Sequence, residues 1–320
     1  MSSKKLPSFQ QPLRLDAPAT SRRRRRLLLL AVALCGIPAC AYLSLHEAAP
    51  APAAPELVEL SGLARSYAAP EWLWGHNDSG DSARLFRVGL HGEDGGNVPV
   101  PGAKAEDWED IASFLWQGQP ALLIGDIGDN YHWRKQITLY AVADIGKGPG
   151  PLPLLWKMDV HYPDGARDAE GLAVDPLTGD ILILSKRDRP PRVYRIAMPA
   201  AAPAAAAAPV TAELVAEVLH IPRPDGSDLI DDPVYGALRD WATAFDLAPD
   251  GSFAVVTCYK NAYLYRRKPG QPWAEVFARA PEVIRTPQFK QTEAGAISAD
   301  GHTLYIGSEQ RAGFAAVPLP

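Results

Sequence analysis

The chain has 320 residues, 47% of them hydrophobic, and a formal net charge of −5, so it can bury the core of an ordinary folded domain. The charge is uneven, because residues 1–26 carry a net charge of +7 and residues 27–320 carry −12. An acidic domain repels phosphate backbones, which excludes nucleic acid as a partner. The 26 glycines and 31 prolines favour a turn-rich, all-β architecture.

The N-terminal segment predicts a membrane anchor. Residues 1–26 form a basic leader that ends in five consecutive arginines, and residues 27–45 contain no charge over a length that can cross a bilayer. Basic residues on the N-terminal flank keep that end in the cytoplasm. We therefore expect a signal-anchor helix in a bacterial inner membrane, with the rest of the chain in the periplasm.

Two alternatives for this segment stay open. The apolar run is also compatible with a cleaved secretory signal. Residues 37–40 (Ile-Pro-Ala-Cys) resemble the lipobox of bacterial lipoproteins, which would place a lipid on Cys40. All three interpretations predict that the folded domain lies outside the cytoplasm.

A tether and a single folded domain follow. Residues 46–56 are rich in proline and alanine and predict a semi-rigid, extended tether. Residues 57–320 form the domain. Cys258 is the only cysteine there, so the domain has no internal disulfide and must be held by its core alone.

Five segments of the domain repeat one pattern. Each has an opening of small and often acidic residues, two apolar strands, and a third strand that carries an aromatic residue. The openings begin at residues 61, 109, 170, 243 and 293, and each second strand ends 14 to 16 residues later. Repeats of this size with three to four strands predict a β-propeller. We expect five blades, and a sixth within residues 214–240 stays an alternative.

The outermost strands are less clear in the sequence. Residues 156–162 are the candidate for the second blade and residues 214–221 for the third. The last blade lacks an outer strand of its own. Residues 56–60 are therefore expected to supply that strand and close the ring, which would remove an open sheet edge.

The topology of a propeller brings the openings and the ends of the second strands to one face of the ring. That face is rich in carboxylates, which repel one another unless a cation neutralises them. Ligand sets made only of oxygen suit calcium. The predicted ligands, in order of preference, are Glu109, Glu170 and Glu293, then Asp126, Asp129 and Asn130, and then Asp78. The alternative is that the Asp and Asn residues only form turns and that no cation binds.

Candidate catalytic residues lie on the same face. They are Glu170, His76, Lys186, Arg187 and Arg134. The three basic residues could anchor an anionic ligand or could pair with nearby carboxylates. His76 could be a base or a hydrogen-bonded loop residue. The sequence contains none of the common hydrolase, nucleotide-binding or zinc-protease motifs.

Several motifs carry a family resemblance. Residues 76–81 (HNDSGD), 107–112 (DWEDIA), 125–130 (GDIGDN) and 162–170 (YPDGARDAE) together resemble uncharacterised secreted bacterial β-propeller proteins. More remotely, residues 170–172 and 182–184 are similar to blades of calcium-dependent β-propeller phytases and of the gluconolactonase and strictosidine synthase group. That second resemblance implies axial carboxylates around a divalent cation and the hydrolysis of an ester.

Two functions are consistent with these features. The first is a membrane-tethered binding module whose acidic, calcium-binding face captures a small molecule, a glycan or a protein. The second is a metal-dependent hydrolase of a lactone or phosphoester, in which the cation would polarise the substrate and acidify a bound water. The absence of an assignable base favours the binding module.

Overall fold

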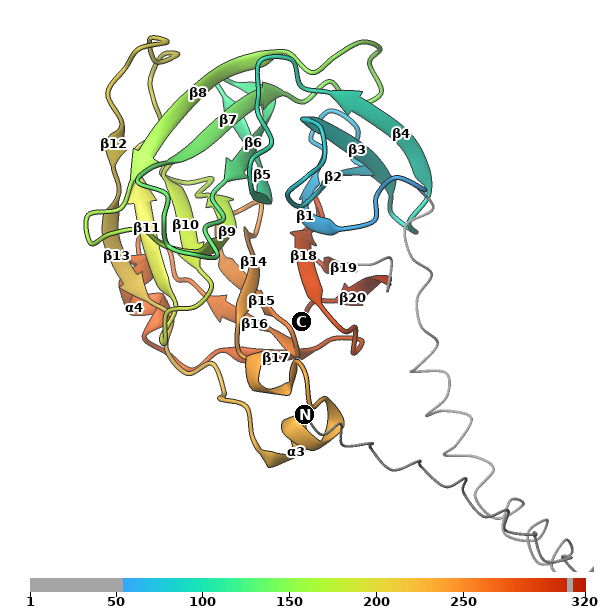
Figure 1. Ribbon diagram of the computed structural model, residues 1–320, viewed down its shortest axis with the longest axis vertical. Coiled ribbons are helices and arrows are strands. Elements are labelled where there is room, and N and C mark those ends of the chain that lie inside the picture. The colour runs from blue at the N-terminus through green and yellow to red at the C-terminus, as the bar shows by residue number, and fades with distance from the viewer. Residues whose placement is uncertain (1–53, 310–312) are drawn as a thin grey trace, which may run out of the picture. The chain divides into compact units, whose positions relative to one another are not determined.

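The computed structural model describes residues 54–309 and 313–320, which form five antiparallel β-sheets arranged around a central axis (Figure 1). The first blade contains β1 (Leu60–Arg65), β2 (Trp72–Asn77), β3 (Arg84–Gly89) and β4 (Asp94–Pro99). The second contains β5 (Trp108–Trp116), β6 (Gln119–Asp126), β7 (Ile137–Ala143) and β8 (Leu154–His161), with the short β12 (Val210–Thr211) parallel to β8.

The remaining three blades repeat the arrangement. The third contains β9 (Ala169–Val174), β10 (Ile181–Ser185), β11 (Arg192–Ile196) and β13 (Glu213–Glu217). The fourth contains β14 (Ala242–Leu247), β15 (Phe253–Cys258), β16 (Asn261–Arg266) and β17 (Glu282–Arg285). The fifth contains β18 (Thr292–Ile297), β19 (Thr303–Ser308) and β20 (Phe314–Pro318). Within each blade the strands are ordered outward from the axis.

The ring is closed by its innermost strands. Each of β1, β5, β9, β14 and β18 contacts the next, and β18 contacts β1 in turn (Figure 1). The prediction of five blades is therefore confirmed. The alternative of a sixth blade in residues 214–240 is wrong, because that stretch holds β13, helix α3 (Gly226–Asp231) and the short 3-10 helix η1 (Gly236–Leu238).

The structure confirms the predicted outer strands of the second and third blades but not that of the fifth. Strands β8 and β13 confirm the candidates in residues 156–162 and 214–221. The described fifth blade has three strands, and residues 56–60 do not add a fourth. Glu59 makes one isolated bridge to Glu309, and Leu60 already belongs to β1. The N–H groups of Val58 and Glu59 instead donate to the side-chain oxygen of Asn77 at the end of β2, which holds the segment against the first blade.

The blades pack face to face through apolar side chains. Tyr194, Tyr263 and Tyr265 are buried between neighbouring blades, and α4 (Trp273–Phe277) packs against β13. The innermost strands carry small residues because they approach one another closely at the axis. A Cβ atom added to Gly171 would lie 2.6 Å from the Cβ of Phe245. The small residues of the repeated openings are therefore a packing requirement.

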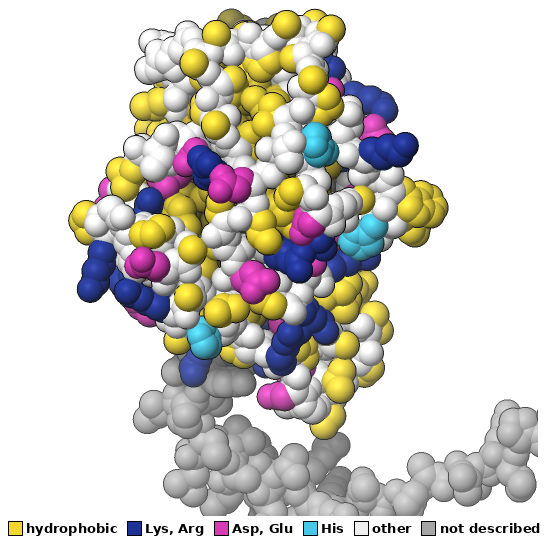
Figure 2. Space-filling view, turned by 90° about the vertical axis from the view of Figure 1, so that its left-hand side faces the viewer, with side chains coloured by type: hydrophobic (Ala, Val, Ile, Leu, Met, Phe, Trp, Pro, Cys, Tyr) yellow, Lys and Arg dark blue, Asp and Glu magenta, His cyan; other side chains and the backbone are white. Residues whose placement is uncertain are grey.

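The outside of the ring is an ordinary solvated surface on the side that Figure 2 shows, where charged groups of both signs lie among scattered hydrophobic ones. No helix in residues 54–309 or 313–320 is long and apolar enough to cross a membrane. The predicted membrane span, residues 27–45, lies outside the described residues, as do the basic leader and most of the tether.

Candidate functional site

Each blade has a β-bulge where its innermost strand begins. The pairing between the first and second strand skips one residue in every blade, and the skipped residues are Ser61, Glu109, Glu170, Thr243 and Glu293. A bulge bends the strand and redirects the side chain of the extra residue. The aligned openings of the sequence repeats are therefore five equivalent bulges. They lie at one end of the ring, where innermost strands begin and second strands end, and we call this end the mouth.

The bulged residues connect neighbouring blades. The hydroxyl of Ser61 donates to the carbonyl oxygen of Glu109 at 2.8 Å, and that of Thr243 donates to the carbonyl oxygen of Thr292 at 2.6 Å. In the other three blades the bulge carries a glutamate. The three glutamates are buried, with 3% to 4% of their surface exposed. Their carboxyl groups therefore lie together inside the mouth and not in bulk water.

Two of the glutamates share a lysine. The ammonium group of Lys186 is paired with Glu170, and its Nζ lies 3.8 Å from Oε2 of Glu293. The hydroxyl of Tyr259 donates to Oε1 of Glu293 at 2.7 Å. Burial lowers the pKa of Lys186, but the negative charges of Glu170 and Glu293 outweigh it and raise the pKa well above its ordinary value. Lys186 is therefore a fixed internal cation.

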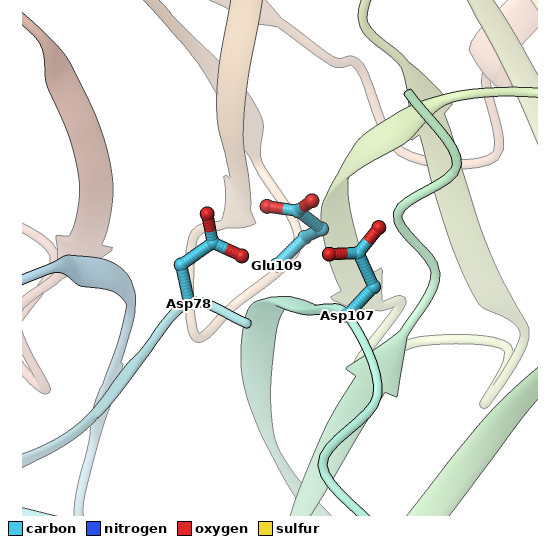
Figure 3. Close-up of side chains that lie close together, drawn as sticks. All are labelled: Asp78, Asp107 and Glu109. Carbon is cyan, nitrogen blue, oxygen red and sulfur yellow. The ribbon is translucent and has the colours of Figure 1, made fainter. Parts of the chain in front are cut away.

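A second group of carboxylates has no such cation. Asp78, Asp107 and Glu109 each offer a carboxylate oxygen within 4.8 Å of the others (Figure 3). Asp78 follows β2, Asp107 precedes β5 and Glu109 is the bulged residue of β5, and Figure 3 shows their carboxyl groups turned toward one another. We call these three residues the acidic trio. Among the described residues, none of the three forms an ion pair with a lysine or arginine.

The negative charge of the acidic trio is only partly compensated, because burial outweighs the lowering of the pKa of Asp78 and Glu109 by Lys186 and of Asp107 by Arg134. Burial and then the negative charge of Asp78 raise the pKa of Asp107 to about 6. Burial and the charge of Glu170 raise the pKa of Glu109 well above its ordinary value. Burial also raises the pKa of Asp78. Carboxyl groups in such surroundings are stabilised by a bound cation.

The loop after β6 closes over the acidic trio. A Cβ atom added to Gly128 would lie 2.2 Å from Oε1 of Glu109 and 2.5 Å from Oδ2 of Asp107. Only glycine allows the loop to approach the two carboxylates this closely. Gly128 donates its N–H to the carbonyl oxygen of Asp107 at 3.2 Å, which fixes the approach.

Three of the predicted ligands hold this loop together instead of facing the trio. Asp126 pairs with Arg134 at 2.8 Å and accepts the N–H of Asp107 at 3.1 Å. Asp129 accepts the backbone N–H groups of Trp133 and Arg134 at 2.8 and 2.9 Å. Asn130 is exposed and accepts a hydrogen bond from Arg187 through its side chain. Their contacts agree with the turn-forming alternative.

The basic candidates are also engaged. Nε of Arg187 lies 2.6 Å from Oδ2 of Asp168, and its guanidinium group stacks 4.9 Å from the ring of Trp241. Arg134 donates to the carbonyl oxygen of Gly128 at 2.8 Å in addition to its ion pair. Neither arginine is an unpaired anchor. The interpretation that the basic residues pair with carboxylates is the one that the geometry supports.

His76 is fully buried below the acidic trio. Its Nδ1 lies 2.9 Å from the carbonyl oxygen of Asn77, and its ring packs edge-on against Trp108 with centroids 5.7 Å apart. Burial lowers the pKa of His76 to about 4, so the ring is neutral at physiological pH. With no exposed surface, it has no direct path to a substrate.

Two aspartates belong to the site although they were not among the predicted ligands. Asp107 is part of the acidic trio, and Asp168 lies within 4.8 Å of Glu109 and Glu170 through its carboxylate. Each stands two residues before a bulged glutamate, so an Asp-x-Glu pattern occurs in both the second and the third blade. That repeated pattern is the signal that would have found them.

No family model matches the chain, and no curated protein matches it either. Among solved structures, the chain is similar to one in a nidogen–laminin complex, with 14% sequence identity, coverage of 82% of this chain and 77% of that one, and a TM-score of 0.45. It is also similar to a chain of hydrazine synthase from Kuenenia stuttgartiensis, with 9% identity, coverage of 81% and 71%, and a TM-score of 0.41. At these levels neither structure informs the function, and membership of the secreted β-propeller family stays a prediction.

Proposed function

We propose that this β-propeller is an extracytoplasmic binding module whose mouth holds a calcium ion at the acidic trio and captures a ligand there. One observation carries the proposal: Asp78, Asp107 and Glu109 bring three carboxylates together without a lysine or arginine partner in the described residues. The neighbouring carboxylates of Asp126, Asp168 and Glu170 each have a cationic side chain.

The chemistry of the acidic trio suits calcium. All three ligands are carboxylates, and they come from two blades, so the geometry is irregular. Calcium accepts six to eight oxygens with flexible geometry, whereas magnesium demands a near-ideal octahedron. The second group of carboxylates is less suitable, because Lys186 and Arg187 already supply positive charge to Glu170 and Asp168. The proposed cation site therefore uses fewer of the carboxylates than the sequence predicted, and Glu170 and Glu293 are paired with Lys186 instead.

We further propose that residues 27–45 anchor the chain in a bacterial inner membrane and leave the propeller in the periplasm. The support is the uncharged run of 19 residues behind five arginines. A secreted form and a lipoprotein modified at Cys40 are the alternatives. Cell fractionation of the full chain and of Cys40→Ser separates them. A signal-anchor keeps both in the membrane fraction, a lipoprotein leaves that fraction only in Cys40→Ser, and a secreted form is absent from it in both.

The ligand at the mouth is a small molecule, a glycan or a protein. The alternative of a metal-dependent lactonase or phosphoesterase has weaker support. His76 is buried and neutral, and Lys186, Arg187 and Arg134 are each held in an ion pair. Glu170→Gln tests this alternative: loss of turnover on a lactone and phosphoester panel at unchanged thermal stability would favour an enzyme.

The decisive experiment is a melting curve of the full chain with EDTA and with calcium, beside metal analysis of the purified protein. A ligand at one hundred times its Kd stabilises a protein by about 2.7 kcal/mol, so we expect the Tm to rise by about 5 °C or more. Asp107→Asn and Glu109→Gln should abolish the rise. Asp94→Asn is the matched control, because Asp94 lies exposed at the start of β4, away from the mouth.

Two results would contradict the calcium site. One is a Tm that does not respond to calcium in the unmodified chain, together with no metal in the purified protein. The other is a calcium response that persists in both trio variants. An equal response to magnesium would retain a cation site but remove the argument for calcium.

A further inference from the structure

The most exposed large hydrophobic side chains of the described residues are concentrated on one face. Ile230, Trp133, Val234 and Tyr131 have 80%, 78%, 72% and 71% of their surface exposed. All four lie on loops at the mouth. At the opposite end of the ring the largest exposures are lower, at 60% for Leu115 near the end of β5 and 59% for Leu177 in the turn after β9. Exposed apolar groups gathered on one face mark an interaction surface.

The loop after β6 presents its two aromatic rings in a fixed arrangement. The rings of Tyr131 and Trp133 are stacked, with centroids 4.7 Å apart and an interplanar angle of 24°. The carboxylate of Asp129 fixes the backbone beneath them by accepting the N–H groups of Trp133 and Arg134. The two rings therefore project from an ordered loop.

The second loop, residues 218–241, joins β13 to β14 and also ends at the mouth. Its helix α3 begins with a capping box between Asp225 and Asp228, and Asp228 pairs with Lys260 of the neighbouring blade. Asp232 accepts the N–H groups of Val234 and Tyr235 at 3.0 and 2.9 Å. The carboxylates of Asp225, Asp228 and Asp232 are thus engaged by backbone N–H groups and by Lys260, while Ile230 and Val234 are exposed.

The described chain also starts on this face. The N–H groups of Val58 and Glu59 both donate to the side-chain oxygen of Asn77 at 3.0 Å, and Asn77 is the last residue of β2 at the mouth. Between residue 45, where the apolar run ends, and residue 54, a fully extended chain spans about 30 Å at most. An anchor in residues 27–45 would thus be joined to the propeller by no more than that length of chain.

We propose that the mouth rim, defined as Tyr131, Trp133, Ile230 and Val234, docks on the surface of the lipid bilayer. This proposal rests on the membrane anchor of the proposed function and names the lipid surface as a partner of the mouth. Tryptophan and tyrosine favour the membrane interface, where the ring is apolar and its polar edge meets the headgroups. The aliphatic side chains of Ile230 and Val234, on the second loop, add buried apolar area.

Charge determines which lipids suit this surface. Asp231 is exposed beside Ile230 and Lys135 is exposed near Trp133, so charges of both signs flank the mouth rim. The domain as a whole carries an excess of negative charge, so a net attraction to anionic lipids is not the expected source of docking. We expect the mouth rim to bind zwitterionic phosphatidylcholine and to be insensitive to salt, because the contribution comes from apolar burial.

The test uses the full chain reconstituted into phosphatidylcholine vesicles with brominated acyl chains, which quench indole fluorescence on contact. The emission of Trp133 is obtained by subtracting the fluorescence of Trp133→Phe from that of the unmodified chain. Two further variants place a new indole at exposed apolar positions: Ile230→Trp on the mouth rim and Leu177→Trp in the turn after β9, at the opposite end. These two are matched controls for each other.

We expect brominated lipid to reduce the Trp133 and Ile230→Trp signals about twofold or more and to leave the Leu177→Trp signal unchanged. The same quenching in high salt would support apolar docking. The docking would be overturned if the chain sediments with the vesicles while both mouth indoles stay unquenched. That result would favour a protein partner at the mouth rim instead. A chain that does not sediment with the vesicles shows instead that the membrane anchor of the proposed function is wrong.

Discussion

Glu109 differs from Glu170 and Glu293 in the charge of the neighbouring side chain. This neighbour comes from a loop that follows a second strand. In the third blade that loop begins with Lys186, which pairs with Glu170 and approaches Glu293. At the equivalent position the first blade has Asp78 and the second blade has Ile127. Lys186 neutralises Glu170 and Glu293, whereas Asp78 adds a third negative charge beside Asp107 and Glu109. Equivalent backbone positions therefore have opposite electrostatic surroundings.

The raised pKa of Asp107 predicts how its removal affects stability. The pKa is about 6 in the fold, against an ordinary value of 3.8, so the folded protein holds more protons than the unfolded chain between these values. Stability is therefore lost as the pH rises through about 6. Without metal, Asp107→Asn should raise the free energy of unfolding by about 1–2 kcal/mol at pH 7.5 and by much less at pH 5. Urea unfolding at the two pH values checks this, and a gain that is equal at both would contradict it.

Gly128 predicts a second effect at the same site. A methyl group in Gly128→Ala would fall within 2.5 Å of carboxylate oxygens of Glu109 and Asp107 and must displace them. We expect calcium affinity to fall about tenfold or more, which corresponds to 1.4 kcal/mol. Titration calorimetry measures the change. Gly118→Ala, in the turn between β5 and β6 where φ is +77°, controls for the effect of backbone strain at a glycine far from the mouth. Unchanged affinity would place the cation elsewhere.

The innermost strands are the elements that build the mouth, and their bulges decide its chemistry. The extra residue in each strand lets a glutamate turn into the ring without breaking the pairing above and below it. The neighbouring strands must then be tied together where the pairing is interrupted. Asp110, the residue after the bulge in β5, performs this role in the second blade.

Asp110 links three blades and should therefore be important for stability. Its buried carboxyl group accepts the N–H of Leu172 in β9 at 2.8 Å and that of Phe245 in β14 at 3.2 Å. Asp110→Ala leaves both N–H groups without an acceptor and should lower the free energy of unfolding by about 2–5 kcal/mol. Asp110→Asn retains an acceptor oxygen and should cost less than half of that in urea unfolding. Equal losses in the two variants would argue that the charge matters more than the acceptor.

At the scale of the whole molecule, the ring has to join its first and last blades. Arg65 of β1 reaches across the axis and pairs with Asp246 of β14 at 2.8 Å, and it also donates to the carbonyl oxygen of Ile297 in β18 at 3.2 Å. Asp246 in turn accepts the N–H of Ile297 at 2.8 Å. One buried ion pair thus connects blades one, four and five at the point of closure.

Removal of one partner of this pair should weaken the entire ring. Arg65→Met leaves Asp246 buried without its cation, which should lower the free energy of unfolding by about 3–5 kcal/mol. Arg195→Met is the matched control, because Arg195 pairs with Asp180 and Glu213 at the surface and should contribute about 0–1 kcal/mol. Denaturant unfolding of both variants compares them. Equal effects would contradict a special role of the closing contact.

The sequence by itself determined the five-bladed ring and the end at which its carboxylates gather. Both follow from local patterning, because the spacing of apolar strands and small openings is imposed within each blade. The membrane segment stays a prediction from the sequence alone, since residues 27–45 lie outside the described residues. Spacing does not reveal a bulge, however, because an extra residue in one strand looks the same as a longer turn.

Only the tertiary structure decided which carboxylates are neutralised. Lys186, Arg187 and Arg134 each find their partner through the meeting of loops from different blades, and no pattern within one repeat encodes that meeting. The sequence therefore ranked Glu170 and Glu293 equal to Glu109 and overlooked Asp107. Charge compensation depends on distances across the axis, and these exist only once the ring has closed.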